Sequence, residues 1–189
     1  MEKATIDQYL ELGQMIKRGE LTKPFVQAII EGRVFVREPA PKGSEVVYAL
    51  TIDRSQTLGD LISAGKYDWV NDDITQENFP VPSKDGTEEV EVVLVHLDEC
   101  LTTDQVKAEL DRRGLKPASI VELLALGSAH PELQREFPLV ALGSSWRHPD
   151  GYVYVPELWD DHGKRKLSLD YVHPGDTWDE SNRFVAVRK

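Results

Sequence analysis

The stretch 114–189 constrains the fold most, because it ends in a series of short segments in which apolar and polar residues alternate. Clusters of Gly, Pro and Asp separate these segments, which are 139–146, 151–158, 166–172 and 183–188. Alternation with a period of two predicts strands, and Asp150-Gly151 is a typical hairpin turn. Three of the four tryptophans of the chain lie here. The sequence therefore predicts a small β region that carries tryptophans.

Helices are expected in front of this β region. Ser119 precedes an apolar run and stands three residues before Glu122, which is the pattern of a capping box. We predict a helix from Ser119 through Leu126. Similar start and stop signals predict helices at 104–113 and 55–66.

The segment 88–97 changes from alternating Glu and Val to a continuous apolar run. A strand of this kind needs burial on both faces at its apolar end. We therefore expect it inside the same sheet as the C-terminal strands, and we expect a further strand at 45–52. The segment 67–74, which presents Trp69, is expected to be a helical or turn element.

Residues 1–40 are expected to form a separate N-terminal domain. Apolar residues at helical spacing run through 5–18 and again through 22–31, and a glycine follows each run. The segment 33–37 alternates like a strand and is followed by a loop rich in Pro and Gly. The sequence thus predicts a helical hairpin and a short strand in 1–40, followed by a second domain in 45–189.

The charge of the chain bears on its partners and its compartment. A formal net charge of −11 opposes binding to nucleic acid phosphates and to anionic membranes. No apolar run approaches the length of about 20 residues that spans a membrane, and the N-terminus lacks a secretory apolar region. The single Cys100 excludes an intramolecular disulfide and is expected to be a small buried residue. We therefore expect a cytoplasmic protein that does not bind membranes and whose charge disfavours nucleic acid as a partner.

The segment GLKPASIVELL, then LGSSW, and the closing strand RFVAVR resemble the C-type-lectin-like fold in its bacterial and phage branch. That branch includes the variable proteins of diversity-generating retroelements, formylglycine-generating-enzyme-like modules and bacterial lectin-like repeats. The positions that match its pattern are Ser119, Glu122, Leu123, Ser144, Ser145, Trp146, Arg183 and Val187. The resemblance implies an α+β fold, in which an N-terminal helical hairpin with short strands precedes a C-type-lectin-like domain.

The resemblance brings no catalytic residues to this chain. The paired cysteines of formylglycine-generating oxidases are absent, since Cys100 is the only cysteine. The order of helices and strands is also similar to that of a group of uncharacterised bacterial proteins, which implies no activity. Calcium needs six to eight oxygen ligands and zinc needs three or four His or Cys ligands at defined spacing, and neither pattern occurs. No catalytic residue, metal or cofactor is therefore predicted.

Aromatic side chains of the β region are the candidate binding surface. Tyr152 and Tyr154 share one face of a strand because the strand period is two. Trp159 and Trp178 stand among acidic residues in expected turns, and exposed aromatic residues beside arginine are typical binding anchors. An exposed position is favoured for Trp159, whereas it is left open whether the indole of Trp178 is exposed or belongs to the core. The candidate binding residues are Trp146, Tyr152, Tyr154, Trp159, Asp160, Asp161, Arg165 and Trp178.

The sequence thus predicts a non-enzymatic module for protein–protein recognition or regulation that acts through an aromatic and acidic loop face. The turns around Trp159 and Trp178 are expected to meet at one end of the β region. The expected partner is another protein with a basic or apolar surface. Two alternatives stay open, namely a hydrolase or transferase whose site the sequence does not reveal, and a DNA-directed regulator that uses the N-terminal helices.

Overall fold

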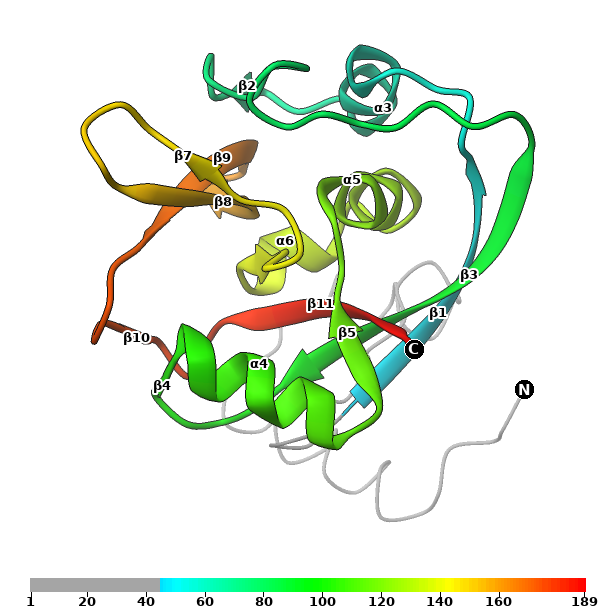
Figure 1. Ribbon diagram of the computed structural model, residues 1–189. Helices are drawn as coiled ribbons and strands as arrows, with labels where there is room; N and C mark the ends of the chain where they lie inside the picture. The colour runs from blue at the N-terminus through cyan, green and yellow to red at the C-terminus, as the bar shows by residue number, and fades with distance from the viewer. Residues whose placement is uncertain (1–44) are drawn as a thin grey trace, which may run out of the picture. The chain divides into compact units, whose positions relative to one another are not determined.

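The computed structural model describes residues 45–189, which lie in a compact unit formed by Pro41–Lys189 (Figure 1). The helical hairpin and the strand predicted within 1–40 lie outside the described residues. Strands take 39% of the described residues and helices take 22%. The described part of the chain is therefore mainly β.

Nine strands form one mixed sheet. They are β1 (Glu45–Asp53), β2 (Trp69–Val70), β3 (Thr87–His96), β5 (Leu115–Pro117), β6 (Leu139–Val140), β7 (Trp146–Arg147), β8 (Val153–Asp161), β9 (Lys164–Val172) and β11 (Arg183–Arg188). Their order is β1-β3-β11-β6-β8-β9-β2, with β5 paired to β11 and β7 paired to β8. A second, two-stranded sheet joins β4 (Leu101–Thr102) to β10 (Thr177–Trp178).

The prediction of an α+β fold with a C-type-lectin-like domain is wrong. The physical reason lies in the strand pairing, because the C-terminal strands do not close on one another as a separate β region. β11 pairs with β3 along one edge and with β6 along the other, so strands from the whole of 45–189 share one sheet. The described residues therefore form a β-rich domain built on a nine-stranded mixed sheet.

The interior position predicted for the strand at 88–97 is confirmed, since β3 lies between β1 and β11. Its apolar residues alternate between the two faces of the sheet, and each face has its own core. Val92 and Leu94 pack in the core around α5 (Ile120–Ala129), whereas Val93 and Val95 pack in the core that contains residues of α4 (Thr103–Arg112). Burial on both faces is why this strand reads as a continuous apolar run.

The sheet curls around α5, which lies between its β1–β3 end and its β8–β9 end (Figure 1). Ser119 is the N-cap of this helix and Glu122 closes the capping box, as predicted. Arg54 donates to Glu122 at 2.8 Å. Burial opposes ionisation of Glu122, but hydrogen bonds from Ser119 and Arg54 outweigh burial and lower its pKa. The capping box therefore also ties α5 to the end of β1.

Three further helices complete the described part, namely α3 (Leu58–Gly65), α4 and the short α6 (Leu133–Glu136). The helices predicted at 55–66 and 104–113 are confirmed, and they begin at Leu58 and Thr103. Thr57 caps α3 with Asp60 as its partner, and Thr102 caps α4 with Gln105 as its partner. In both helices the cap is the residue that completes a reciprocal capping box. No helix of residues 45–189 is long and apolar enough to cross a membrane.

The segment 139–146, predicted as one strand, is divided into β6 and β7 by a loop at Gly143. The backbone N–H of Gly143 donates to Ala118 O at 2.9 Å, and an added Cβ would lie 2.5 Å from the backbone oxygens of Pro117 and Ala118. The Oγ of Ser144 accepts a hydrogen bond from the backbone N–H of Ile120 at 2.9 Å. The loop therefore supports the start of α5 and leaves β7 free to pair with β8.

Candidate functional site

Three aromatic side chains form a continuous row across β7, β8 and β9. Trp146 lies opposite Tyr154, and Tyr154 lies opposite Tyr171 on the next strand. Directly opposed residues point to the same face of a sheet, so the three rings are neighbours. Their centroids are 6.0 Å apart for Trp146 and Tyr154 and 6.4 Å apart for Tyr154 and Tyr171.

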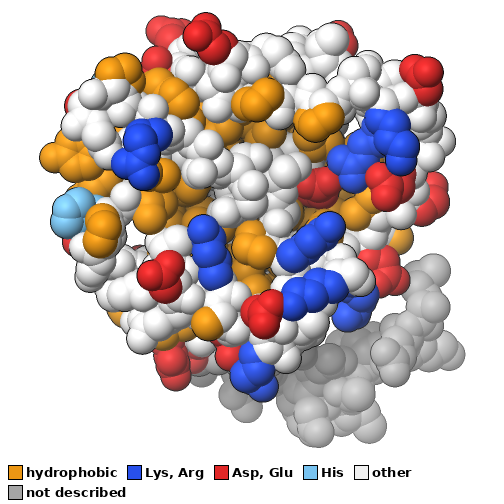
Figure 2. All heavy atoms as spheres, in the orientation of Figure 1, with side chains coloured by type: hydrophobic (Ala, Val, Ile, Leu, Met, Phe, Trp, Pro, Cys, Tyr) orange, Lys and Arg blue, Asp and Glu red, His pale blue; other side chains and the backbone are white. Residues whose placement is uncertain are grey.

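Three more rings extend this row. His148 lies 5.0 Å from Trp146, Tyr152 lies 5.6 Å from Tyr171, and His173 lies 6.3 Å from Tyr171, all between ring centroids. Tyr152 is 47% exposed and Tyr171 is 45% exposed. In Figure 2, hydrophobic side chains gather on the side of the molecule where Figure 1 shows β7, β8 and β9. We call this set the aromatic face: Trp146, His148, Tyr152, Tyr154, Tyr171 and His173.

An aspartate borders the aromatic face at each end. Asp150 Oδ2 lies 2.8 Å from His148 Nδ1, and Asp150 Oδ1 accepts from the backbone N–H of Tyr152 at 3.0 Å. The hydrogen bond from Tyr152 lowers the pKa of Asp150. At the other end, Tyr171 Oη donates to Asp176 Oδ2 at 2.8 Å, which raises the pKa of the phenol. The rim of the face is therefore negatively charged.

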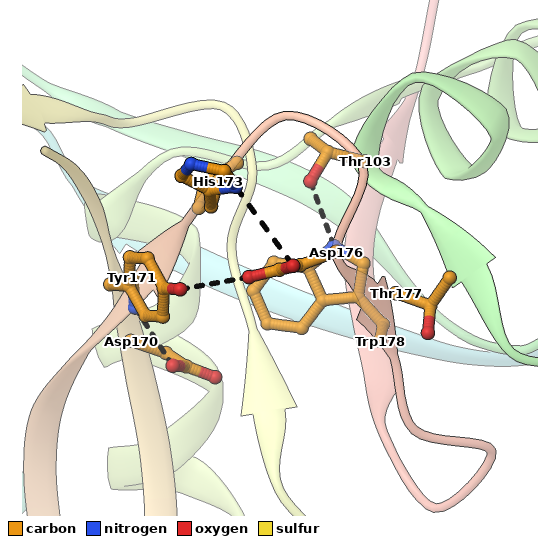
Figure 3. Close-up of a pocket in the computed structure, with 8 residues that line it drawn as sticks. Thr103, Asp170, Tyr171, His173, Asp176, Thr177 and Trp178 are labelled. Atoms are coloured by element: carbon orange, nitrogen blue, oxygen red, sulfur yellow. Dashed lines mark hydrogen bonds and ion pairs between the residues drawn. The ribbon is translucent and has the colours of Figure 1, made fainter.

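A cavity of about 160 Å³ opens beside the aromatic face, between the end of β9 and β10 (Figure 3). Tyr171 is shared by the cavity and the face. Asp170 also lines the cavity, and its Oδ1 accepts from the backbone N–H of Tyr171 at 2.7 Å. Burial raises the pKa of Asp170 although this hydrogen bond acts against it. The cavity thus combines an aromatic wall with carboxylates.

Trp178 is 7% exposed and also lines this cavity. Its ring packs edge-on against Phe184 with centroids 5.9 Å apart, and its Nε1–H donates to Thr103 Oγ1 at 3.0 Å. The indole therefore belongs to the core and contributes only a small surface to the cavity. The turn expected at Trp178 is the short strand β10.

Trp159 and the adjacent aspartates lie at the far end of the β8–β9 hairpin. This pair of strands turns at His162-Gly163, where both residues have positive φ, whereas β10 follows the opposite end. The Lys166 ammonium lies 5.1 Å from the Trp159 ring and 5.6 Å from the Trp69 ring, measured to the centroids. The expected cluster of Trp159 with Trp178 is therefore wrong, since the hairpin separates them.

The other predicted residues at that end take part in structural contacts. Asp161 Oδ2 pairs with Lys166 at 2.5 Å. Asp160 accepts from Arg135 at 3.1 Å and from the turn N–H of Gly163 at 2.7 Å. These bonds hold the hairpin turn in place. Only three of the predicted binding residues, Trp146, Tyr152 and Tyr154, lie together on the aromatic face.

Arg165, also predicted as a binding residue, is 7% exposed. Its guanidinium donates to Gly65 O at 2.6 Å, to Gly127 O at 2.7 Å and to Gln134 Oε1 at 3.1 Å. It also lies 5.0 Å from the centroid of the Tyr67 ring. The arginine therefore joins α3, α5 and α6 inside the domain and does not reach a partner.

Tyr171, His148 and His173 also belong to the aromatic face, although they are not among the predicted binding residues. Tyr171 joins the face because the two-residue turn fixes which residue of β9 lies opposite Tyr154. The sequence carried a signal for this register in the His162-Gly163 dipeptide, since such short turns favour positive φ at both residues. We expected a longer turn between the segments 151–158 and 166–172, and a longer turn does not fix which residues of the two strands lie opposite each other.

Among residues 45–189, no group of three or more His, Cys, Asp or Glu side chains is placed to hold a metal ion. Cys100 is exposed, contrary to the prediction. No family model, no curated protein and no solved structure matches this chain.

Proposed function

We propose that the protein is a non-enzymatic binding module whose aromatic face docks an extended segment of a partner protein. The observation that carries the proposal is the continuity of the face: six rings, which lie in or directly beside three adjacent strands, form one series of ring contacts, and two of the tyrosines remain almost half exposed. Aromatic side chains supply large contact areas at low cost in conformational entropy, which is why they are enriched at protein interfaces.

An extended segment suits this surface because part of the neighbouring sheet edge is open. β2 pairs only with Lys166 and Leu167 of β9, and the adjacent loop adds a last bond from Asn71 N–H to Leu167 O at 3.0 Å. Beyond Leu167, the outer edge of β9 has no strand partner within 45–189. An extended peptide that pairs with a sheet edge gains main-chain hydrogen bonds while its side chains contact the adjacent surface.

The charge around the face favours a basic or neutral segment. Asp150 and Asp176 border the face and Asp170 lines the adjacent cavity. The net charge of −11 repels nucleic acid phosphates at long range, so stacking of bases on the rings is opposed by electrostatics. Arginine and lysine side chains gain both from carboxylates and from tyrosine faces. A protein segment with such residues fits the surface best.

The test is a selection of random peptides displayed on phage, with the full chain as bait. The enriched peptides are then synthesised and their dissociation constants measured on variants. Replacing both Tyr152→Ala and Tyr171→Ala removes the two tyrosines of the face that are almost half exposed. We expect binding to weaken at least about 30-fold, which corresponds to about 2 kcal/mol.

The matched control is Trp69→Ala, because Trp69 is also 45% exposed but lies outside the aromatic face. It is expected to change the dissociation constants by less than about 2-fold. Thermal melts of both variants confirm that they fold. If no peptide is enriched over an unrelated acidic protein, or if Trp69→Ala weakens binding as much as the tyrosine pair, the proposal is wrong.

A further inference from the structure

We propose that the cavity between β9 and β10 is a recognition pocket for one arginine side chain of the docked segment. This inference rests on the proposed function, because the pocket shares Tyr171 with the aromatic face. It adds the chemical identity of the residue that anchors the partner.

The size of the pocket suits a single side chain. Its volume is about 160 Å³, whereas pockets for small-molecule ligands typically measure about 300–1,000 Å³. Tyr171 and His173 line one part of it and the buried indole of Trp178 lines another (Figure 3). A long side chain that crosses Tyr171 from the aromatic face can therefore insert its head group between these rings.

The charge of the pocket calls for a cation. Asp170 and Asp176 both line it, and no lysine or arginine does. Asp176 already accepts from Tyr171 Oη, and its Oδ1 lies 3.9 Å from His173 Nδ1. Asp170 accepts only the backbone N–H of Tyr171, so its second oxygen has no hydrogen-bond partner among residues 45–189. A half-buried carboxylate with unused acceptor capacity is stabilised by an inserted donor of positive charge.

Arginine fits this environment better than lysine. A guanidinium presents several N–H donors in one plane, so it can bond to two carboxylates while its flat faces stack on aromatic rings. An ammonium is a compact and strongly hydrated point charge without a planar fork, so it can neither form the same paired hydrogen bonds nor stack a flat face on a ring. Asp170, Asp176 and Tyr171 all line the pocket, so it offers both carboxylates and an aromatic ring.

The test uses isotope-labelled full chain and Nα-acetyl-arginine amide as the probe, without any peptide partner. The NMR signal of the Trp178 indole N–H reports on the pocket, and a conservative Trp178→Phe variant assigns it. We expect a saturable shift with the arginine amide and at least about 10-fold weaker binding of the citrulline amide, which has the same shape without the charge. The lysine amide should bind at least about 3-fold more weakly than the arginine amide.

Asp170→Asn preserves the shape of the side chain and is expected to weaken arginine amide binding at least about 10-fold. The control is Asp179→Asn, which changes an exposed aspartate that does not line the pocket. A missing shift, equal binding of citrulline or lysine amide, or an unchanged affinity of Asp170→Asn overturns the pocket assignment. The phage selection tests the aromatic face independently of this titration. Failure of the arginine pocket can therefore be distinguished from failure of the docking surface.

Discussion

Tyr154 lies directly opposite Tyr171 across the β8–β9 ladder, with the two ring centroids 6.4 Å apart. This pairing joins the aromatic residues of β7 and β8 to the residue that borders the cavity. Aromatic pairs at such distances contribute about 0.5–1.5 kcal/mol beyond the area they bury, so the rings hold one another in place. The face is therefore organised before a partner arrives, and less entropy is lost on binding.

Trp178 is expected to act in folding more than in binding. The variant Trp178→Ala removes a side chain that is 7% exposed and packed on Phe184, so it should lower the free energy of unfolding by about 3–5 kcal/mol. Trp69→Ala, at 45% exposure, should cost about 1 kcal/mol or less. Denaturant titrations measure both values. Similar losses for the two variants would contradict the placement of Trp178 in the core.

Glu157 makes stability depend on pH. Burial, together with the nearby charge of Asp170, raises the pKa of Glu157 from 4.5 to about 8. A raised pKa means that the folded state prefers the neutral acid. The contribution of Glu157 to the free energy of unfolding is fully present below about pH 4.5, which is its pKa in the unfolded chain. This contribution is lost as the pH rises towards 8.

Glu157→Gln should therefore leave stability unchanged at pH 4 and increase it at pH 9. The full pKa difference corresponds to roughly 5 kcal/mol, and the partial exposure of the side chain reduces the expected gain to on the order of 2 kcal/mol. Denaturant titrations at both pH values measure the difference. The control is Glu136→Gln, at an exposed position. An equal effect of Glu157→Gln at the two pH values would refute this assignment.

Arg165 is expected to be irreplaceable by lysine. Arg165→Lys keeps the charge but cannot reach Gly65 O, Gly127 O and Gln134 Oε1 together. Buried carbonyl groups that lose their partners cost about 1–3 kcal/mol each, so we expect a loss of about 2 kcal/mol or more. Arg188→Lys, in a half-exposed pair with Glu91, should change stability by less than about 0.5 kcal/mol. If the two lysine variants are equally stable, the internal role of Arg165 is wrong.

Local patterns in the sequence predicted much of the secondary structure. The period-two and continuous apolar patterns located β1, β3 and β11, and the Ser119–Glu122 pair located the start of α5. These signals lie within a few neighbouring residues, so no knowledge of the tertiary structure is needed to use them. The interior position of β3 also followed from its composition, because an exposed face would not be so apolar.

Long-range pairing is what the sequence patterns could not supply. Trp69 was expected in a helical or turn element, yet β2 pairs in parallel with β9 through a contact with residues almost one hundred positions away. A two-residue strand has no periodicity to recognise. The aromatic face depends on the same kind of information, since Trp146, Tyr154 and Tyr171 become neighbours only through the register of β7, β8 and β9.

The docking surface can be located directly by NMR of the aromatic side chains while an enriched peptide is added to the full chain. Our proposal predicts that the signals of Tyr152, Tyr154, Tyr171 and Trp146 shift and saturate together. Trp69 and Trp159, which flank Lys166 at the other end of the hairpin, should not shift. Saturable shifts of Trp69 and Trp159 with unchanged signals from the three tyrosines would contradict the assignment of the aromatic face as the binding surface.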